Sequence, residues 1–287
     1  MSSFSAEWLA LREPHDAAAR SEELVALLRG AGARPTLRAV VDLGSGSGAN
    51  MRWLAPRLGG DQAWRLVDHD DALLAAAERA TREWAAGRGA RLGGDGDELV
   101  VSGADFACRV SRTRLDLAAE LDRLELAVRA LVTSSALLDL VSAEWLEVLA
   151  RRCRDAAADV CFALTYDGRT ACTPAEPEDA EVLELFNRHQ RGDKGFGPAL
   201  GPSAARRAAA TFTAFGYRVV TRASDWRIGP RDQAMQRALL GGWLDAAVEI
   251  APWRRAALAA WQRRRLAHVA SGHSELVVGH ADLVGSL

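Results

Sequence analysis

The sequence has little net charge and no long apolar run. Its 287 residues include 36 basic and 38 acidic side chains, a formal net charge of −2, so no broad positive face for nucleic acid or acidic membranes is expected. No stretch approaches the roughly 20 apolar residues that span a bilayer. The first residues carry acids where a signal peptide has a basic segment. We therefore expect a cytoplasmic protein that binds a small molecule, with no nucleic acid and no membrane as partner.

Cysteine and lysine are scarce. The four cysteines lie 45, 8 and 11 residues apart, which matches neither a zinc pattern nor a compact disulfide scaffold. The three histidines nearest the C-terminus have no metal-ligand spacing either, so we predict no metal. Lys194 is the only lysine in an arginine-rich chain. Its retention suggests a need for a compact ammonium group, which arginine replaces poorly; chance retention is the alternative.

Short β-branched runs alternate with helical patterns along the first 166 residues. This alternation is typical of parallel βαβ units, and it predicts an α/β fold with a doubly wound, mostly parallel sheet. The expected strands are 37–43, 64–68, 108–117, 127–134 and 160–166. The expected helices between and after them are 49–58, 71–86 and 143–154.

Segments outside this alternation predict additions to the sheet. Residues 1–36 are predicted to form an N-terminal helical cap, with helices at 5–12 and 14–30. We expect one Rossmann-like domain at 37–287, carrying substrate-cap insertions at about 168–202 and 231–268. The expected elements in this second half are helices at 179–190 and 203–215, a strand at 217–226, two helices within 231–268, and a last strand at 274–284, seven strands in all.

The first expected strand runs directly into a glycine-rich turn, Asp42-Leu43-Gly44-Ser45-Gly46-Ser47-Gly48. Alternate glycines let the backbone turn sharply and approach a ligand closely. The spacing is G-x-G-x-G, whereas the dinucleotide fingerprint is G-x-G-x-x-G, so the turn disfavours NAD. Asp68 closes the next expected strand about 20 residues later, where a carboxylate can accept hydrogen bonds from ribose hydroxyls.

This combination resembles the class I S-adenosylmethionine-dependent methyltransferases of the small-molecule type. Their first motif is an acid followed by GxGxG, and their second is an acid at the end of the next strand. By motif the resemblance covers about residues 37–168. It implies a seven-stranded Rossmann-like fold and S-adenosyl-L-methionine as the cofactor.

The resemblance also implies roles for residues at matching positions in the turn. Gly44, Ser45 and Gly46 would line the methionine part of the cofactor with backbone groups. Asp42 would lie behind the turn and support it, or reach the cofactor amino group through water. An Asp42 that only forms a hydrogen bond with the turn is the structural alternative.

Further matches lie at the following strand ends. Asp68 would hold the ribose and His69 would flank the adenine, while Asp116 and Leu117 would meet the adenine amino group and Ser134 would place a carbonyl near the cofactor amine. As alternatives, Asp68 could cap the next helix and Asp116 could be a solvated acid. The agreement of three acids at consecutive strand ends favours one shared ligand.

Two residues outside these motifs are further candidates. Arg20, on the N-terminal helices, would pair with the cofactor carboxylate, or else be an ordinary surface arginine. Asp139 follows the fourth expected strand and could act as a general base or bind an amine. Its alternative is an exposed acid in the first turn of a helix, favoured by the helix dipole.

The glycine-rich segment near residue 190 is a candidate wall of the acceptor pocket. His189 could take a proton near neutral pH, and Arg191 or Lys194 could bind a carboxylate or phosphate. Phe196 would contribute an aromatic wall, and Tyr166 at the end of the fifth strand would contact the acceptor. A solvated loop between two helices is the alternative.

Tryptophans and arginines interleave at 253–265, which could suggest an RNA-binding face. Trp253 and Trp261 are eight residues apart, so a shared core face of one helix is the preferred reading.

The sequence therefore predicts transfer of a methyl group to an oxygen, nitrogen or carbon of a small molecule, with the acceptor atom and oligomeric state left open. Two alternatives are a non-catalytic protein that binds S-adenosylmethionine or a nucleotide, and an NAD-dependent oxidoreductase.

Overall fold

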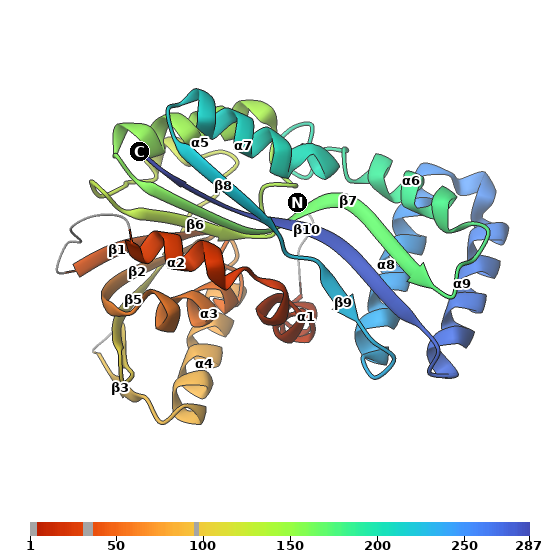
Figure 1. Cartoon of the computed structure of the whole chain (residues 1–287), viewed down its shortest axis with the longest axis horizontal. Coiled ribbons are helices and arrows are strands. Elements are labelled where there is room, and N and C mark those ends of the chain that lie inside the picture. Colours follow the sequence, from red (N-terminus) through yellow and green to blue (C-terminus); the bar gives the residue numbers. More distant parts are fainter. Residues whose placement is uncertain (1–4, 31–36, 95–97) are drawn as a thin grey trace.

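Strand β1 (Leu37–Leu43) lies inside one twisted sheet in the computed structural model, which describes residues 5–30, 37–94 and 98–287. Most of its residues are buried, as in a strand covered on both faces. It pairs in parallel with β2 (Gly60–Asp68) and β6 (Leu131–Ser135), and β5 (Phe106–Arg114) and β7 (Asp159–Thr173) continue the parallel set. The predicted doubly wound, mostly parallel sheet is confirmed (Figure 1).

The C-terminal half of the chain completes one side of the sheet. Strand β10 (Glu275–Ser286) lies antiparallel between β7 and β8 (Arg218–Ala223), and β9 (Trp226–Ile228) also pairs with β10. The single strand predicted at 217–226 is therefore divided. The break lies at Ser224 and Asp225: the N–H of Ser224 still donates to the carbonyl of His280, but the N–H of His280 donates to the carboxylate of Asp225 and not to a strand carbonyl.

The opposite edge carries a hairpin that the sequence analysis did not predict. Strands β3 (Arg91–Gly93) and β4 (Leu99–Ser102) extend the sheet antiparallel to β5. Strand β3 has three residues, all of them exposed, and β4 has only four, so both are too short for a clear alternation of apolar and polar residues. The full order is β3-β4-β5-β2-β1-β6-β7-β10-β8.

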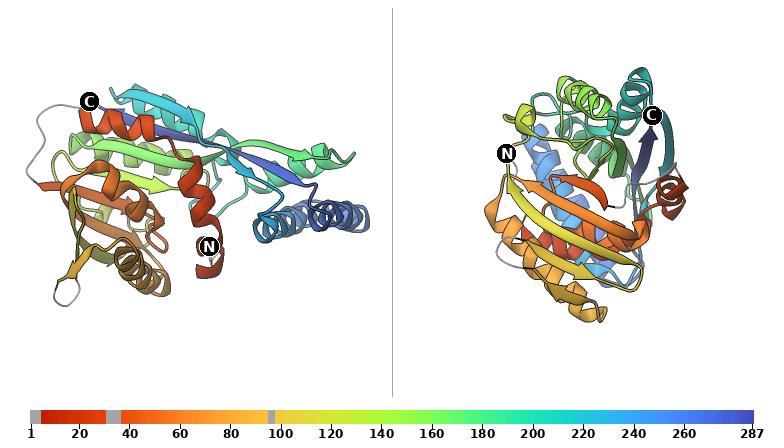
Figure 2. Two further views of the ribbon diagram at one scale, coloured as in Figure 1. Left: turned by 60° about the horizontal axis from the view of Figure 1, so that its bottom comes forward. Right: turned by 90° about the vertical axis from the view of Figure 1, so that its left-hand side faces the viewer.

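Helices cover both faces of the sheet (Figures 1 and 2). One face packs against α2 (Glu22–Gly30), α3 (Ala49–Leu58) and α4 (Asp71–Gly87). The other packs against α5 (Ala143–Asp155) and α7 (Ala204–Ala214). Short 3-10 turns are η1 (Leu121–Arg123), η2 (Gly201–Ser203) and η3 (Pro252–Arg254).

The connections that follow the neighbouring strands β1 and β6 lead to opposite faces of the sheet, and this creates the place for a ligand. The chain leaves β1 for α3 on one face, and it leaves β6 for α5 on the other. Because these connections diverge, a crevice opens at the carboxyl ends of β1 and β6. The glycine turn that follows β1 lies at this edge.

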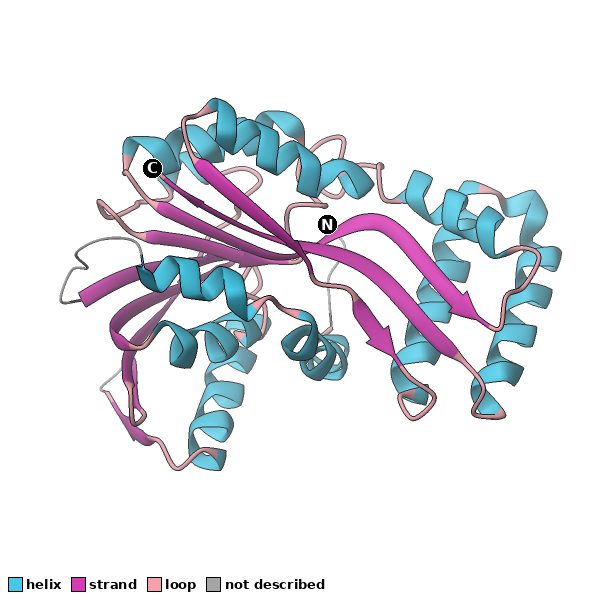
Figure 3. Ribbon diagram, viewed as in Figure 1, coloured by secondary structure: helices cyan, strands magenta, loops and turns pink. Residues whose placement is uncertain are grey.

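A separate group of helices packs on the far ends of β7 and β10 (Figure 3). It comprises α6 (Asp179–His189), α8 (Gln233–Ile250) and α9 (Arg255–Ala270), which share one apolar core. The excursion expected from about residue 168 begins later, because β7 continues to Thr173. This part of β7 alternates between half-buried and exposed positions, so it lacks the apolar run that marked the rest of the strand.

The two tryptophans of the arginine-rich segment have different surroundings. Trp261 is buried and donates from its indole N–H to Asp179, whereas Trp253 is 77% exposed. The predicted shared face is wrong because Trp253 belongs to η3, before α9 begins, so helical spacing does not relate the two.

Helix α1 (Ala6–Ala19) crosses the carboxyl edge of the sheet. The sequence predicted a break near Pro14, but α1 continues through this proline and the break falls at Arg20–Ser21. The proposed domain boundary at residue 36 lies outside the described residues. Among the described helices, none has the length and apolar character needed to cross a membrane.

One buried carboxylate joins the N-terminal helices to the sheet. Asp282 on β10 accepts hydrogen bonds from the backbone N–H groups of Ser21 and Leu164, each at 2.8 Å. Replacing Asp282 by Ala should lower the free energy of unfolding by about 2–4 kcal/mol, because a buried N–H is left without a partner. Urea denaturation measures the change. The exposed Asp245 of α8, replaced in the same way, should change stability by less than about 0.5 kcal/mol; equal effects would contradict this role of Asp282.

Candidate functional site

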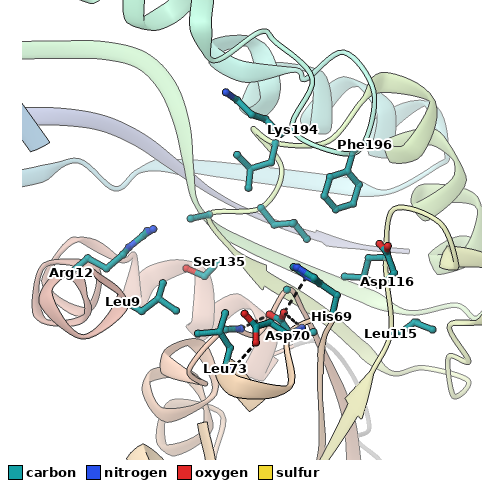
Figure 4. A pocket seen from close by; sticks show the side chains of 17 residues that line it. Leu9, Arg12, His69, Asp70, Leu73, Leu115, Asp116, Ser135, Lys194 and Phe196 are labelled. Atoms are coloured by element: carbon teal, nitrogen blue, oxygen red, sulfur yellow. Dashed lines mark hydrogen bonds and ion pairs between the residues drawn. The ribbon is translucent and has the colours of Figure 1, made fainter. Parts of the chain in front are cut away.

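A cavity of about 860 Å³, part of it open to solvent, lies at the carboxyl edge of the sheet. The glycine turn and the ends of β2, β5 and β6 form its base, and α1 and the segment around residue 195 form its walls (Figure 4). The residues that line it are Leu9, Arg12, Gly44, Gly46, Asp68, His69, Asp70, Leu73, Leu115, Asp116, Leu117, Ser135, Ala136, Leu137, Leu140, Lys194 and Phe196.

The glycine turn is closed by hydrogen bonds within the protein. The N–H of Ser45 donates to the carbonyl of Val67, and the N–H of Gly48 donates to the carbonyl of Ser45. The N–H of Gly46 donates to the carboxylate of Asp68 at 2.8 Å. A turn that binds phosphate presents such N–H groups to its ligand. Here these three are already used, so the turn is poorly suited to a pyrophosphate.

The backbone of the turn needs glycine. Gly44 and Gly46 have φ angles of +60° and +53°, in the left-handed region. A Cβ atom on Gly46 would also lie 3.1 Å from the side chain of Leu9, so the turn and α1 approach closely.

Asp68 combines a structural bond with a position on the cavity wall. Its Oδ2 atom accepts from Gly46, and its Oδ1 atom accepts from the N–H of Asp70 at 3.1 Å. A carboxylate oxygen can accept more than one hydrogen bond. Asp68 can therefore also accept hydroxyl groups of a ligand, and His69 lies beside it on the same wall.

Asp116 lies two residues beyond β5, in a turn and not at the strand end predicted from the sequence. Its Oδ1 atom accepts from the N–H of Ala118 at 2.9 Å, which fixes the turn. With Asp68 and Asp70 it gives the cavity three carboxylates, which we call its acidic side. Such a side favours a ligand that carries positive charge or hydrogen-bond donors.

Asp42 is fully buried behind the glycine turn and does not line the cavity. Its Oδ1 atom accepts from the side-chain amide of Asn50 at 2.6 Å, and its Oδ2 atom has no hydrogen-bond partner in the described structure. Burial raises the pKa of Asp42 to about 7, against the lowering effect of the Asn50 hydrogen bond. The structure thus supports a role in holding the turn.

Two cations line the cavity as well, Arg12 on α1 and Lys194 after α6; with the apolar residues Leu9, Leu140 and Phe196 we call them its basic side. Figure 4 shows Lys194 and Phe196 across the cavity from Asp70 and Leu73. Phe196 packs edge-on against Trp145 of α5, with ring centroids 5.5 Å apart.

Several predicted site residues lie outside this cavity. Tyr166 donates its hydroxyl to Asn187, and Arg191 donates to the carbonyl of the same residue. Asp139 is buried and its backbone carbonyl accepts from Gly201; burial raises its pKa to about 6. The predicted exposure of Asp139 on a helix turn is therefore wrong. His189 contacts Lys194 instead of the cavity.

Arg20 borders a second cavity of about 740 Å³ on the α3 side, which adjoins the first at Ser135. Its guanidinium group lies 4.0 Å from the ring centroid of Trp53, and its Nε atom is buried without a partner in the described structure. The alternative of an ordinary surface arginine is wrong. Ser45 and Ser134 are buried close by and their hydroxyl groups also lack partners.

Sequence reasoning missed several cavity residues. Leu137 and Leu140 follow β6, and their place after a strand end was a usable signal. Leu9 and Arg12 are three apart on α1 and so share a helical face, but nothing in the sequence set which face meets the cavity.

Within the described part of the chain, no group of three or more histidine, cysteine or acidic side chains could hold a metal ion. The four cysteines are free, and burial raises the pKa values of Cys108 and Cys153 to about 12. These two side chains are therefore neutral thiols.

Comparisons with known proteins gave matches in structure only. No protein-family model and no curated protein matches the chain. An S-adenosylmethionine-dependent methyltransferase from Thiobacillus denitrificans, solved with S-adenosylhomocysteine, is similar at 16% identity and a TM-score of 0.47, covering 99% of this chain and 100% of that one. One from Geobacter sulfurreducens, also with S-adenosylhomocysteine, has 16% identity, a TM-score of 0.46 and full coverage of both chains.

The cyclopropane synthase MmaA2 of Mycobacterium tuberculosis is similar at 11% identity and a TM-score of 0.44, covering 92% of this chain and 83% of that one. These likenesses concern the fold alone, and TM-scores below 0.5 carry no argument about activity. What this chain binds has to be inferred from its own residues.

The buried Asp42 predicts a pH-dependent stability. The folded state keeps a proton on Asp42 up to about pH 7, whereas an unfolded aspartate loses it near pH 4. Stability therefore falls as the pH rises from about 4 to about 7 and this loss then stays constant. Asp42→Asn removes the effect, so its stability relative to the wild type should rise by about 2 kcal/mol between pH 5 and pH 8.

Urea unfolding across this pH range measures the effect. Asp61→Asn, at an exposed carboxylate on β2, is the matched control and should give no such gain. A constant difference between Asp42→Asn and the wild type at every pH would contradict the protonation of Asp42.

Proposed function

We propose that the protein is an S-adenosylmethionine-dependent methyltransferase acting on a small molecule. One observation carries this proposal: a glycine turn closed by its own hydrogen bonds faces three carboxylates at the crevice of a doubly wound sheet. A ligand that suits this arrangement has a sugar, a positive charge and no phosphate. S-adenosylmethionine has all three properties.

The residues present fit this cofactor. Asp68 would accept both ribose hydroxyl groups, since it lines the cavity and its oxygens keep free lone pairs. His69, Asp116 and Leu117 border the same end and would surround the adenine. The carboxylates would also balance the sulfonium charge.

The opposite end of the cofactor would lie over the glycine turn. Gly44 and Gly46 expose backbone without side chains there, and Ser135 borders both cavities. Arg20 would receive the cofactor carboxylate from the second cavity, which would give its buried guanidinium group an anionic partner. Asp42, Ser45 and Ser134 would support this end from behind the turn.

When bound, S-adenosylmethionine would supply an electrophilic methyl group: the acceptor bonds to the methyl carbon as the carbon–sulfur bond breaks, and S-adenosylhomocysteine is the leaving group. The protein has to align the acceptor with this methyl group and exclude water. Leu9, Leu137, Leu140 and Phe196 make the remaining space apolar. The enclosure of this space by α1 and the segment around residue 195 favours a small acceptor over a macromolecule.

The alternative NAD-dependent oxidoreductase fits less well. NAD carries a pyrophosphate, which needs free N–H groups at the glycine turn, and the N–H groups of Ser45, Gly46 and Gly48 donate elsewhere. A non-catalytic protein that binds S-adenosylmethionine remains the second candidate, since the cofactor residues alone do not require turnover.

Isothermal titration with S-adenosylhomocysteine, S-adenosylmethionine and NAD tests the cofactor. We expect the first two to bind and NAD to bind at least about 100-fold more weakly, because its pyrophosphate would meet the acidic side. Tight binding of NAD would overturn the assignment. Release of a labelled methyl group to a panel of small alcohols, amines and acids then separates an enzyme from a binding protein.

Asp68→Asn should weaken binding of S-adenosylhomocysteine by about 1–3 kcal/mol, because charge-assisted hydrogen bonds to the ribose become neutral ones. Asparagine keeps the side-chain shape and an oxygen for the N–H of Gly46. Asp71→Asn, at a 71% exposed carboxylate three residues away, is the control and should leave binding unchanged. Equal affinities of Asp68→Asn and the wild type would remove Asp68 from the site.

A further inference from the structure

The two walls of the cavity differ in charge. The acidic side carries Asp68, Asp70 and Asp116, whereas the basic side carries Arg12 and Lys194 among apolar groups. Asp16, which pairs with Arg12, does not line this cavity. Figure 4 shows the ammonium end of Lys194 pointing away from the acidic side, so a small acceptor on the basic side meets a largely apolar surface that ends at a cation.

Lys194 is held by a hydrogen-bonded chain that leaves its charge unbalanced. Its Nζ atom lies 3.2 Å from Nδ1 of His189, and Nε2 of His189 lies 3.0 Å from a carboxylate oxygen of Glu249. An ionised carboxylate only accepts, so Nε2 carries the hydrogen and Nδ1 is left to accept from the ammonium group. The chain thus positions Lys194 in its charged form.

No carboxylate among the described residues forms an ion pair with Lys194. Glu249 reaches it only through the imidazole, and its side chain is 69% exposed to solvent, where water weakens the attraction. Partial burial lowers the pKa of Lys194 and Glu249 only partly opposes this. A half-buried cation without a contacting anion is stabilised when a ligand brings one.

Arg12 is a second cation beside the cavity, but its charge is paired with Asp16, so Lys194 is the cation that lacks a contacting anion in the part of the chain that the structure describes. Its Nε and Nη2 atoms donate to Asp16, and its guanidinium group lies 4.9 Å from the ring centroid of Trp226. These contacts fix a buried guanidinium group beside the cavity. Leu9, Leu140 and Phe196 surround the two cations with apolar surface.

We infer that the acceptor is an acidic small molecule, with an apolar body against Leu9, Leu140 and Phe196 and a carboxylate that binds Lys194. His189 and Glu249 are positioning residues that hold the ammonium group. This inference rests on the proposed function, because only a methyltransferase has a methyl acceptor. Binding of an acid to the basic side does not depend on that activity.

The sole lysine makes the test specific. Protein grown with ¹³C,¹⁵N-lysine gives one lysine side-chain signal, that of Lys194. The labelled protein is titrated separately with 3-phenylpropanoate and with the uncharged 3-phenylpropanamide, which has the same shape. Each titration is done in the presence and in the absence of S-adenosylhomocysteine. We expect the acid to shift the lysine signal and to bind about tenfold or more tightly than the amide, as one charge-assisted hydrogen bond provides.

Matched variants assign the preference to Lys194. Lys194→Met keeps the apolar stem and should abolish the preference for the acid, whereas Lys194→Arg should retain part of it. Arg206→Met removes a charge from an exposed position on α7 away from the cavity and should leave the preference unchanged. His189→Asn should move the lysine signal even without acid; an unmoved signal would exclude it as a positioning residue.

The outcomes separate the two proposals. If S-adenosylhomocysteine binds but the acid neither shifts the lysine signal nor binds more tightly than the amide, the acidic acceptor is wrong and the proposed function stands. A preference for the acid that persists in Lys194→Met also overturns the inference. If S-adenosylhomocysteine does not bind but the acid preference is present, the proposed function fails and the basic side still binds an acid.

Discussion

The site depends on the hydrogen bond between the N–H of Gly46 and the carboxylate of Asp68. This bond joins the turn after β1 to the end of β2, the neighbouring parallel strand. It also occupies an N–H group that would otherwise attract a phosphate, and it holds a negative charge on the cavity wall. A single contact thus shapes the turn and selects the charge of its ligand.

The charge of the whole cavity extends this selection. Carboxylates gather where the strands β2 and β5 end, and cations come from α1 and the segment after α6. The protein has almost no net charge, so the separation within one cavity is local. This separation suits two neighbouring ligands of opposite charge: by our proposals, a cationic nucleoside on one side and an acid on the other.

The additions to the sheet serve the same cavity. Helix α1 brings Leu9 and Arg12 over the turn, and α6 carries His189, which holds Lys194. Helix α8 supplies Glu249, so the helices on the far ends of β7 and β10 reach the site through one hydrogen-bonded chain. The long β7 and β10 strands are the support that makes this reach possible.

The sequence by itself determined the sheet, the turn and the acids around it. The bounds of β1 and α3 agree with the predicted ranges, because a β-branched run and a glycine turn act through local geometry. Asp68 and Asp116, which the sequence placed after two neighbouring strands, both line the cavity because parallel strands end at one edge of the sheet, although Asp116 lies two residues beyond β5. Only the tertiary structure decided that Asp42 and Asp139 are buried away from the cavity, that Arg20 borders a second one, and that Glu249 meets His189 from 60 residues away. Such contacts depend on how helices pack on one another, and the spacing of residues along the chain does not encode that packing.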